Sequence, residues 1–121
     1  MPLLQVFGYE NHYSNGSGKL REEFNQKLRE ALASTEGLRI TPKQVSIVHS
    51  GDIDSENGLI LIIRGLFVRE ERTLEVKNEA CENIKNALLS FRYLSRDIGW
   101  IEVWTESTDP SLEGFADYKN T

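Results

Sequence analysis

The same order of elements, strand then helix then strand, is predicted twice along this chain of 121 residues, and this repeat constrains the fold more than any other feature. In the first half, strands are predicted at 3–9, where the residues are mostly apolar, and at 45–49, where apolar and polar residues alternate. Between them, apolar residues recur every three or four positions over 19–35, which predicts a helix capped by Gly37. Polar residues with glycine, asparagine and serine make 10–18 a predicted loop.

The second half of the chain begins with the aliphatic run 59–68, which is typical of a strand buried on both faces. A charged turn follows at 69–72. Thr73 is then predicted to cap a second amphipathic helix that extends to about Tyr93. The segment 99–105 is the last predicted strand. The two halves therefore share a layout, although their sequences are not alike.

This order predicts a single α/β (α+β) domain over 1–121, in which two β-α-β units form a four-stranded mixed sheet with two helices on one face. The other face of the sheet needs a cover as well. Alternation along the strands supplies apolar side chains to both faces. Val45 and Ile47 lie opposite Val48, and Ile101 and Val103 lie opposite Trp100 and Trp104. Because an exposed apolar face favours association, we predict that the chain assembles with copies of itself.

The charge balance and the single cysteine narrow the class of protein. A net charge of -5 argues against nucleic acid and anionic membranes as partners, since both attract clustered Lys and Arg. Cys81 alone excludes an internal disulfide and fits a reducing compartment. No leader segment is recognisable and the longest apolar run is too short to span a bilayer, so a cytoplasmic location is expected. His12 and His49 lie too far apart in sequence to suggest a metal site.

Two motifs carry a family resemblance. At the N-terminus, Met1-Pro2-Leu3-Leu4-Gln5-Val6 places a proline directly ahead of a strand, and Leu66 to Lys77 joins a strand to a helix through Arg72-Thr73-Leu74-Glu75. With the two β-α-β units, these motifs resemble the tautomerase superfamily. The layout and Val48-His49 are most similar to its 5-carboxymethyl-2-hydroxymuconate isomerase branch. The implied fold is tautomerase (MIF-like), and the ferredoxin-like sandwich, which has the same order of elements, is the alternative.

Pro2 is the candidate catalytic residue. Removal of Met1 leaves Pro2 with a secondary amine, and an α-amino group has a pKa of about 7.7–8.0 in model peptides. Burial or a nearby cation lowers that pKa, so that the amine is neutral and accepts a proton. The resemblance implies the same role, an N-terminal proline acting as general base. If Met1 is retained, the nitrogen is an amide and Pro2 is only the residue that follows the initiator.

The resemblance also implies substrate-binding arginines after the third strand, where Arg69 and Arg72 lie. A guanidinium group holds a carboxylate through two parallel hydrogen bonds and stabilises an enolate oxygen. The alternative is a solvated charged turn with glutamate partners. His49, at the end of the second strand, is a candidate to orient substrate or, alternatively, a surface histidine. Arg64 interrupts an aliphatic strand, which predicts an ion pair between subunits rather than catalysis.

The predicted function is that of an isomerase or tautomerase, which moves a proton in an unsaturated or 2-keto carboxylic acid with Pro2 as the base. No cofactor and no metal are expected, because the proton moves within the substrate. The resemblance implies a homotrimer. The alternative is a non-catalytic module, ferredoxin-like or a degenerate tautomerase, that binds a ligand or partner. A third hypothesis keeps the fold but changes the reaction to decarboxylation or hydration.

Overall fold

The computed structural model describes residues 2–13, 18–51, 57–94, 96–109, 112–114 and 116. In chain order, the strands and α-helices are β1 Leu3–Phe7, α1 Tyr9–Tyr13, α2 Gly18–Ala33, β2 Ser46–Ser50, β3 Gly58–Phe67, α3 Leu74–Leu89 and β4 Trp100–Thr108. Two short 3-10 helices, η1 Glu36–Leu38 and η2 Pro42–Gln44, lie in the connection from α2 to β2.

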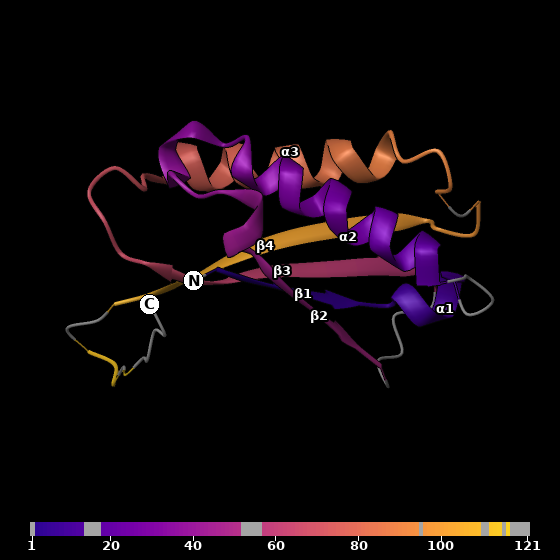
Figure 1. Cartoon of the computed structure of the whole chain (residues 1–121), viewed down its shortest axis with the longest axis horizontal. Helices are drawn as coiled ribbons and strands as arrows, with labels where there is room; N and C mark the ends of the chain where they lie inside the picture. Colours follow the sequence, from indigo (N-terminus) through magenta and orange to yellow (C-terminus); the bar gives the residue numbers. More distant parts are fainter. Residues whose placement is uncertain are drawn as a thin grey trace.

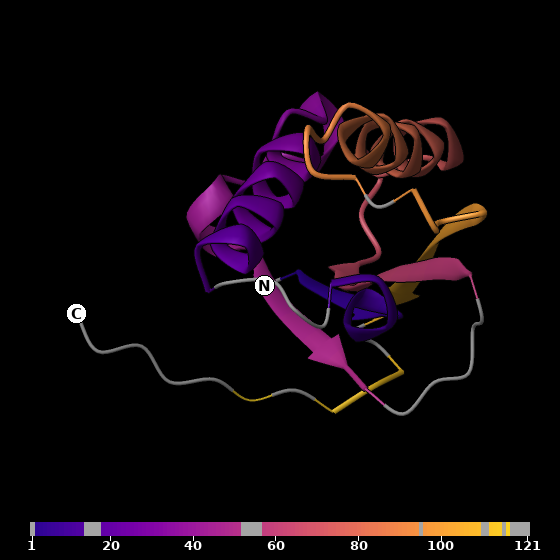
Figure 2. The same ribbon diagram turned by 90° about the vertical axis from the view of Figure 1, so that its right-hand side faces the viewer.

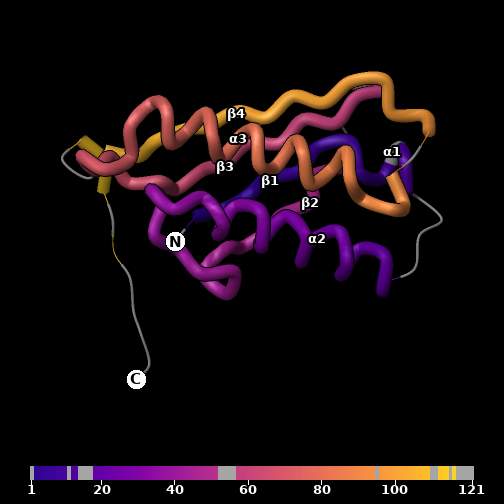
Figure 3. Tube along the Cα trace, turned by 90° about the horizontal axis from the view of Figure 1, so that it is seen from above, coloured from indigo at the N-terminus to yellow at the C-terminus, as the bar shows by residue number. Residues whose placement is uncertain are grey.

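The four strands form one mixed sheet with the order β2-β1-β3-β4. β1 is parallel to β2 and antiparallel to β3, and β3 is parallel to β4. The two long helices, α2 and α3, lie on the same side of this sheet (Figures 1 and 2) and run side by side across it when seen from above (Figure 3). The predicted four-stranded mixed sheet with two helices on one face is therefore confirmed.

The core lies between the sheet and the two helices. Because successive residues of a strand face opposite sides of the sheet, alternate residues of β1 and β3 face the helices and are fully buried. The strand side chains without any exposed surface are Leu4, Val6, Leu59, Leu61, Ile63 and Leu66. The helices contribute residues spaced four apart, which are Phe24, Leu28 and Leu32 from α2 and Ala80, Ile84 and Leu88 from α3. Each large aliphatic side chain buried in this way contributes roughly 1.5–3 kcal/mol.

The opposite face of the sheet is not covered by the described residues. Val48, Trp100 and Trp104 leave 44%, 40% and 58% of their surface exposed there. We call this surface the open face, and its apolar members are Leu3, Phe7, Val48, Ile60, Ile62, Trp100 and Trp104. Strand β3 is fully buried on one side only, so the predicted burial on both of its faces is wrong for the single chain. The aliphatic run predicted a second cover, which the described residues do not supply.

A β-bulge interrupts the pairing of β3 with β4 between Ile63 and Leu66. Gly65, inside the bulge, has a φ of 75°, a conformation that glycine adopts without strain. The extra residue keeps Ile63 and Leu66 both on the buried side, with Arg64 on the open face. There, Arg64 Nε lies 2.8 Å from Glu106 Oε2 of β4. Arg64 therefore has an ion-pair partner within the chain, and the predicted pair between subunits stays a prediction.

The segment after β1 differs from the prediction. Strand β1 ends at Phe7, and α1 replaces the last predicted strand residue and the start of the predicted loop. Tyr9 and Tyr13 lie about one helical turn apart, so both rings pack against Phe24 of α2, at centroid distances of 4.8 and 5.9 Å. The polar residues between the two tyrosines indicated a loop, but burial of both rings favours a helical turn. Residues 14–17 of the predicted loop lie outside the described residues.

The connection after α2 also differs from the prediction. Helix α2 ends at Ala33, and Gly37 lies inside η1 instead of capping the helix. The left-handed conformation falls on Arg39, whose φ is 51°. Gly37 is needed for a different reason, because a Cβ at this position would lie 2.5 Å from Cγ2 of Val76 in α3. The glycine thus allows η1 to pack closely against α3.

The second long helix and the last strand form where they were predicted, with different ends. Thr73 caps α3 as predicted, and its Oγ1 accepts the N–H of Val76 at 3.2 Å. Helix α3 ends at Leu89, before Tyr93. Strand β4 continues beyond the predicted end at 105 to Thr108.

Candidate functional site

Pro2 is buried at the start of β1, at one end of the sheet. Its carbonyl oxygen accepts the N–H of Ser46 at 3.1 Å. The next residue, Leu3, pairs with Ser46 of β2 on one side and with Arg64 of β3 on the other. Because β1 and β2 begin at this end and β3 finishes there, the turn from β3 into α3 lies at the same end (Figure 1). The fold therefore brings Pro2 and the turn with the two candidate arginines to one end of the molecule.

Arg69 and Arg72 lie in this turn, which the N–H of Arg72 closes by donating to Arg69 O at 3.0 Å. Arg69 is exposed, and none of the ion pairs between described residues includes it. Arg72 is half-buried, and its Nη1 donates to Phe67 O at 3.1 Å while its Nη2 donates to Leu38 O at 3.2 Å. Burial, together with the charge of Arg69, lowers the pKa of Arg72. The turn also contains Glu70 and Glu71, and the charge of Glu71 opposes these two effects on the pKa of Arg72.

His49 lies at the opposite end of the sheet. It pairs with Val6, four residues along β1 from Pro2, which corresponds to about 13 Å at ~3.3 Å per residue. Its Nε2 donates to Asn25 Oδ1 at 2.7 Å, and its ring packs edge-on against Tyr9 with 4.7 Å between centroids. The structure does not bring His49 to Pro2. Its predicted part in substrate binding stays a prediction.

The half-buried position of His49 predicts a pH-dependent stability. Burial is the main reason that its pKa falls from 6.5 to about 4, with a smaller contribution from Arg21. The unfolded chain therefore takes up a proton below pH 6.5 that the folded chain takes up only near pH 4. The free energy of unfolding consequently decreases as the pH falls through this window, by about 2 kcal/mol at pH 5.

We expect His49→Gln to remove this decrease, measured by urea unfolding at pH 7 and at pH 5. His12→Gln is the matched control, because His12 Nε2 lies 3.3 Å from Gly58 O in another contact, and it should keep the wild-type pH dependence. If the free energy of unfolding of His49→Gln decreases from pH 7 to pH 5 as much as that of the wild type, His49 is not the cause of the pH dependence.

A cavity of about 590 Å³ lies beside β2 at the Pro2 end of the sheet. Its walls are formed by Gln26, Arg29, Pro42, Lys43, Val45, Ser46 and Ile47. Arg29 Nε donates to Val45 O at 3.1 Å, next to the residue whose N–H reaches Pro2. Arg29 and Lys43 thus give positive charge to a cavity whose wall residue Ser46 bonds to the Pro2 carbonyl, and the sequence did not predict this. Arg29 belongs to the polar pattern of α2, and only the pairing of β1 with β2 brings this cavity near Pro2.

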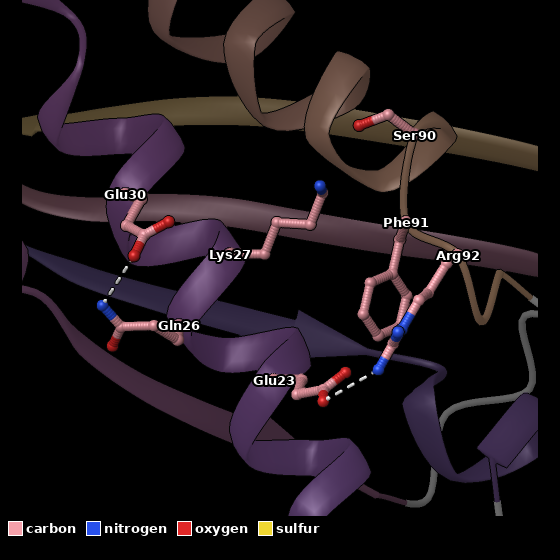
Figure 4. A pocket seen from close by; sticks show the side chains of 7 residues that line it. All are labelled: Glu23, Gln26, Lys27, Glu30, Ser90, Phe91 and Arg92. Carbon is pink, nitrogen blue, oxygen red and sulfur yellow. Dashed lines mark hydrogen bonds and ion pairs between the residues drawn. The ribbon is translucent and has the colours of Figure 1, made fainter.

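A second cavity, of about 360 Å³, lies between α2 and the residues that follow α3 (Figure 4). Its walls are formed by Glu23, Gln26, Lys27, Glu30, Ser90, Phe91 and Arg92. Polar groups here contact each other, since Arg92 Nη2 lies 3.4 Å from Glu23 Oε1 and Gln26 Nε2 donates to Glu30 Oε1 at 3.1 Å. This cavity shares Gln26 with the first one, and none of the residues predicted to form the site lies in the walls of either cavity.

Two observations concern metals and membranes. Among the described residues, no group of three or more His, Cys, Asp or Glu side chains is placed to hold a metal ion. Within the same ranges, no helix has both the length and the apolar character needed to cross a membrane.

Cys81 is half-buried on α3, and burial raises the pKa of its thiol.

Comparison with known proteins supports the fold. No protein-family model and no curated protein matches the sequence. Among solved structures, a fused 4-OT described as an asymmetric trimer has a TM-score of 0.65 at 11% identity, covering 93% of this chain and 91% of its own. Malonate semialdehyde decarboxylase has a TM-score of 0.62 at 9% identity, covering 97% and 92%. Pt0534 inactivated by 2-oxo-3-pentynoate has a TM-score of 0.62 at 10% identity, covering 95% and 90%.

These similarities extend over nearly the whole chain, including both β-α-β units. The resemblance predicted from the N-terminal proline and the β3–α3 turn is confirmed at the level of the fold. The chain has the same fold as these solved structures, the tautomerase fold.

Proposed function

We propose that the protein is a cofactor-independent isomerase of the tautomerase kind, which moves a proton in a small unsaturated or 2-keto carboxylic acid. The observation that carries this proposal is the placement of a buried Pro2 at the same end of the sheet as Arg69 and Arg72. Pro2 would supply the base, and the arginines would supply the positive charge that a carboxylate needs. Proton transfer within one substrate requires no further group.

Pro2 is suited to act as a general base once Met1 has been removed. Burial disfavours a positive charge on its nitrogen. The proline ring fixes φ, and Ser46 holds the Pro2 carbonyl, so the nitrogen has a defined position at the start of β1. A neutral amine in this position can take a proton from the carbon next to a carbonyl, or from the hydroxyl of an enol, and return it to another carbon of the same molecule.

Arg69 is the group that we assign to the substrate carboxylate. It is exposed, unlike Arg72, and no described carboxylate pairs with it. Its planar guanidinium can hold a carboxylate with two parallel hydrogen bonds. Positive charge in the turn also stabilises the enolate that forms after proton removal. His49 is not part of this mechanism, because it lies at the other end of the sheet.

We further propose that the protein is a homo-oligomer, specifically a trimer, whose subunits cover one another's open faces. The apolar side chains of that face and the exposed Trp100 and Trp104 support this proposal. The fused 4-OT of similar fold is described as a trimer. Assembly of this kind would place neighbouring subunits close to the ends of the sheet.

A second candidate function is decarboxylation or hydration with the same residues. Malonate semialdehyde decarboxylase, which has a similar fold, is described with decarboxylase and hydratase activities. The third candidate is a non-catalytic module that binds a ligand or partner, and retention of Met1 would favour it.

The experiment that tests the first proposal compares two forms of the protein that differ only at the N-terminus. One form has Met1 removed, as verified by intact mass, and the other carries a short extension that turns the Pro2 nitrogen into an amide. Ketonisation of a 2-hydroxydienoate or of phenylenolpyruvate is followed by ultraviolet absorbance. We expect the free form to accelerate the reaction and the extended form to stay near the uncatalysed rate. Equal rates would rule out Pro2 as the general base for these substrates and would favour the non-catalytic module that binds a ligand or partner.

A further inference from the structure

We propose that Arg72 is a positioning residue of the Pro2 site, which connects the two chain segments that flank Pro2. The inference rests on the proposed function, since it assigns Arg72 a part in the same site. It also separates Arg72 from Arg69, although the two residues share one turn and were predicted to share one role. Arg69 binds the anion, and Arg72 sets the geometry around the base.

The contacts of Arg72 connect segments that are distant in sequence. Its Nη1 donates to Phe67 O, at the last residue of β3, at 3.1 Å. Its Nη2 donates to Leu38 O, at the last residue of η1, at 3.2 Å. One planar guanidinium therefore joins the end of β3 to the connection between α2 and β2. The fixed fork of an arginine suits two acceptors on different segments better than the single ammonium of a lysine.

Both segments continue to the neighbours of Pro2. From Leu38 the chain passes through η2 to Ser46, whose N–H donates to Pro2 O at 3.1 Å. From Phe67 the chain runs back along β3 to Arg64, which pairs with Leu3 on the other side of β1. Strands β2 and β3 lie on either side of β1, which connects them within the sheet. Arg72 provides a second connection between them beyond the end of the sheet.

The stretch from η1 to β2 is held in other ways that do not involve β3. Val76 of α3 packs on Gly37, and Asn83 of α3 donates to Thr35 Oγ1 at 2.9 Å. Within η2, the side chain of Gln44 accepts the Thr41 N–H at 2.9 Å. These contacts join the connection to α3 or to itself. The link from this connection to the end of β3 comes from Arg72.

Arg72→Lys is the informative substitution, because it keeps the positive charge and loses the two-pronged contact. Arg69→Lys is the matched control, since it makes the same change in the same turn at a residue with no such backbone contact among the described residues. We expect Arg72→Lys to speed hydrogen exchange of the Leu38, Arg39 and Ser46 amides by about 10-fold or more, and Arg69→Lys to leave it unchanged.

Two further measurements connect this exchange to the site. The first is the pH midpoint at which the Pro2 nitrogen titrates, measured by NMR with ¹⁵N-proline. We expect this midpoint to shift in Arg72→Lys and to be unchanged in Arg69→Lys. The second is kinetics, where Arg72→Lys should lower kcat by about 10-fold and Arg69→Lys should mainly raise KM. Because charge is kept in both variants, a difference between them cannot come from the loss of a cation.

The outcomes separate this inference from the proposed function. Faster exchange with a moved Pro2 midpoint supports the positioning role, even if the wild type shows no turnover and the proposed function fails. Unchanged exchange in Arg72→Lys overturns the inference. Faster exchange with an unmoved Pro2 midpoint and unchanged kcat also overturns it, because Arg72 would then be only a structural contact. Should Arg72→Lys not fold, Arg72→Gln, which keeps a planar group with two donors, is judged by the same three readouts.

Discussion

Replacing Pro2 with alanine is expected to lower kcat/KM for ketonisation by about 10²–10⁴-fold, the range that a positioned acid–base group contributes. The variant keeps a primary amine but loses the ring that fixes φ at the start of β1, so the nitrogen no longer has a defined position. In free-energy terms, this is a loss of about 3–5 kcal/mol of transition-state stabilisation, at ~1.4 kcal/mol per tenfold change. The measurement is the initial rate by ultraviolet absorbance, with Met1 shown to be absent from both proteins.

The control for Pro2→Ala is a measurement of its folding stability. The Pro2 carbonyl, which accepts the Ser46 N–H, remains in the variant, so the pairing of β1 with β2 should persist. We therefore expect the free energy of unfolding to change by no more than about 1 kcal/mol. A variant that is fully folded and as active as the wild type would rule out Pro2 as the base.

Replacing Ile62 with glutamate is expected to convert the proposed trimer into monomers at micromolar concentration. Ile62 lies on the open face near the middle of β3, paired with Gln5 of β1 and Trp104 of β4. In the single chain this side chain is only half-buried, so the substitution should leave folding largely intact. In an interface each carboxylate would lose its water without gaining a partner, which costs several kcal/mol per subunit. The association constant should fall by more than about 10³-fold, at ~1.4 kcal/mol per tenfold.

Sedimentation velocity measures this effect, with urea unfolding to show that the variant is folded. Leu89→Glu is the matched control, because Leu89 is also an aliphatic residue, has 57% of its surface exposed and lies on α3 in the helix layer. It should assemble as the wild type does. A monomeric wild type, or a trimeric Ile62→Glu, would show that the open face is not the interface.

The sequence alone determined the features that local patterns encode. Apolar spacing located two amphipathic helices and four strands, because helical and extended periods differ within a few residues. Thr73 was predicted as the cap of α3 from its place ahead of a helical pattern, and its Oγ1 accepts the Val76 N–H. Pro2 and the turn arginines were candidates because of a family resemblance, carried by the proline ahead of a strand and by the Arg72-Thr73-Leu74-Glu75 stretch. Alternation in the strands also predicted that one sheet face would stay apolar and uncovered.

The tertiary structure decided what depends on contacts between distant residues. The direction and order of the strands place Pro2 and the β3–α3 turn at one end and His49 at the other, although the sequence treated all of them as one site. Two buried tyrosine rings turned a predicted loop into α1. The requirement for Gly37 comes from Val76, and the bonds of Arg72 go to Leu38 and Phe67, partners that no local pattern names. Residue types and short periods are written in the sequence, whereas these roles arise only when pairing of the strands brings remote segments together.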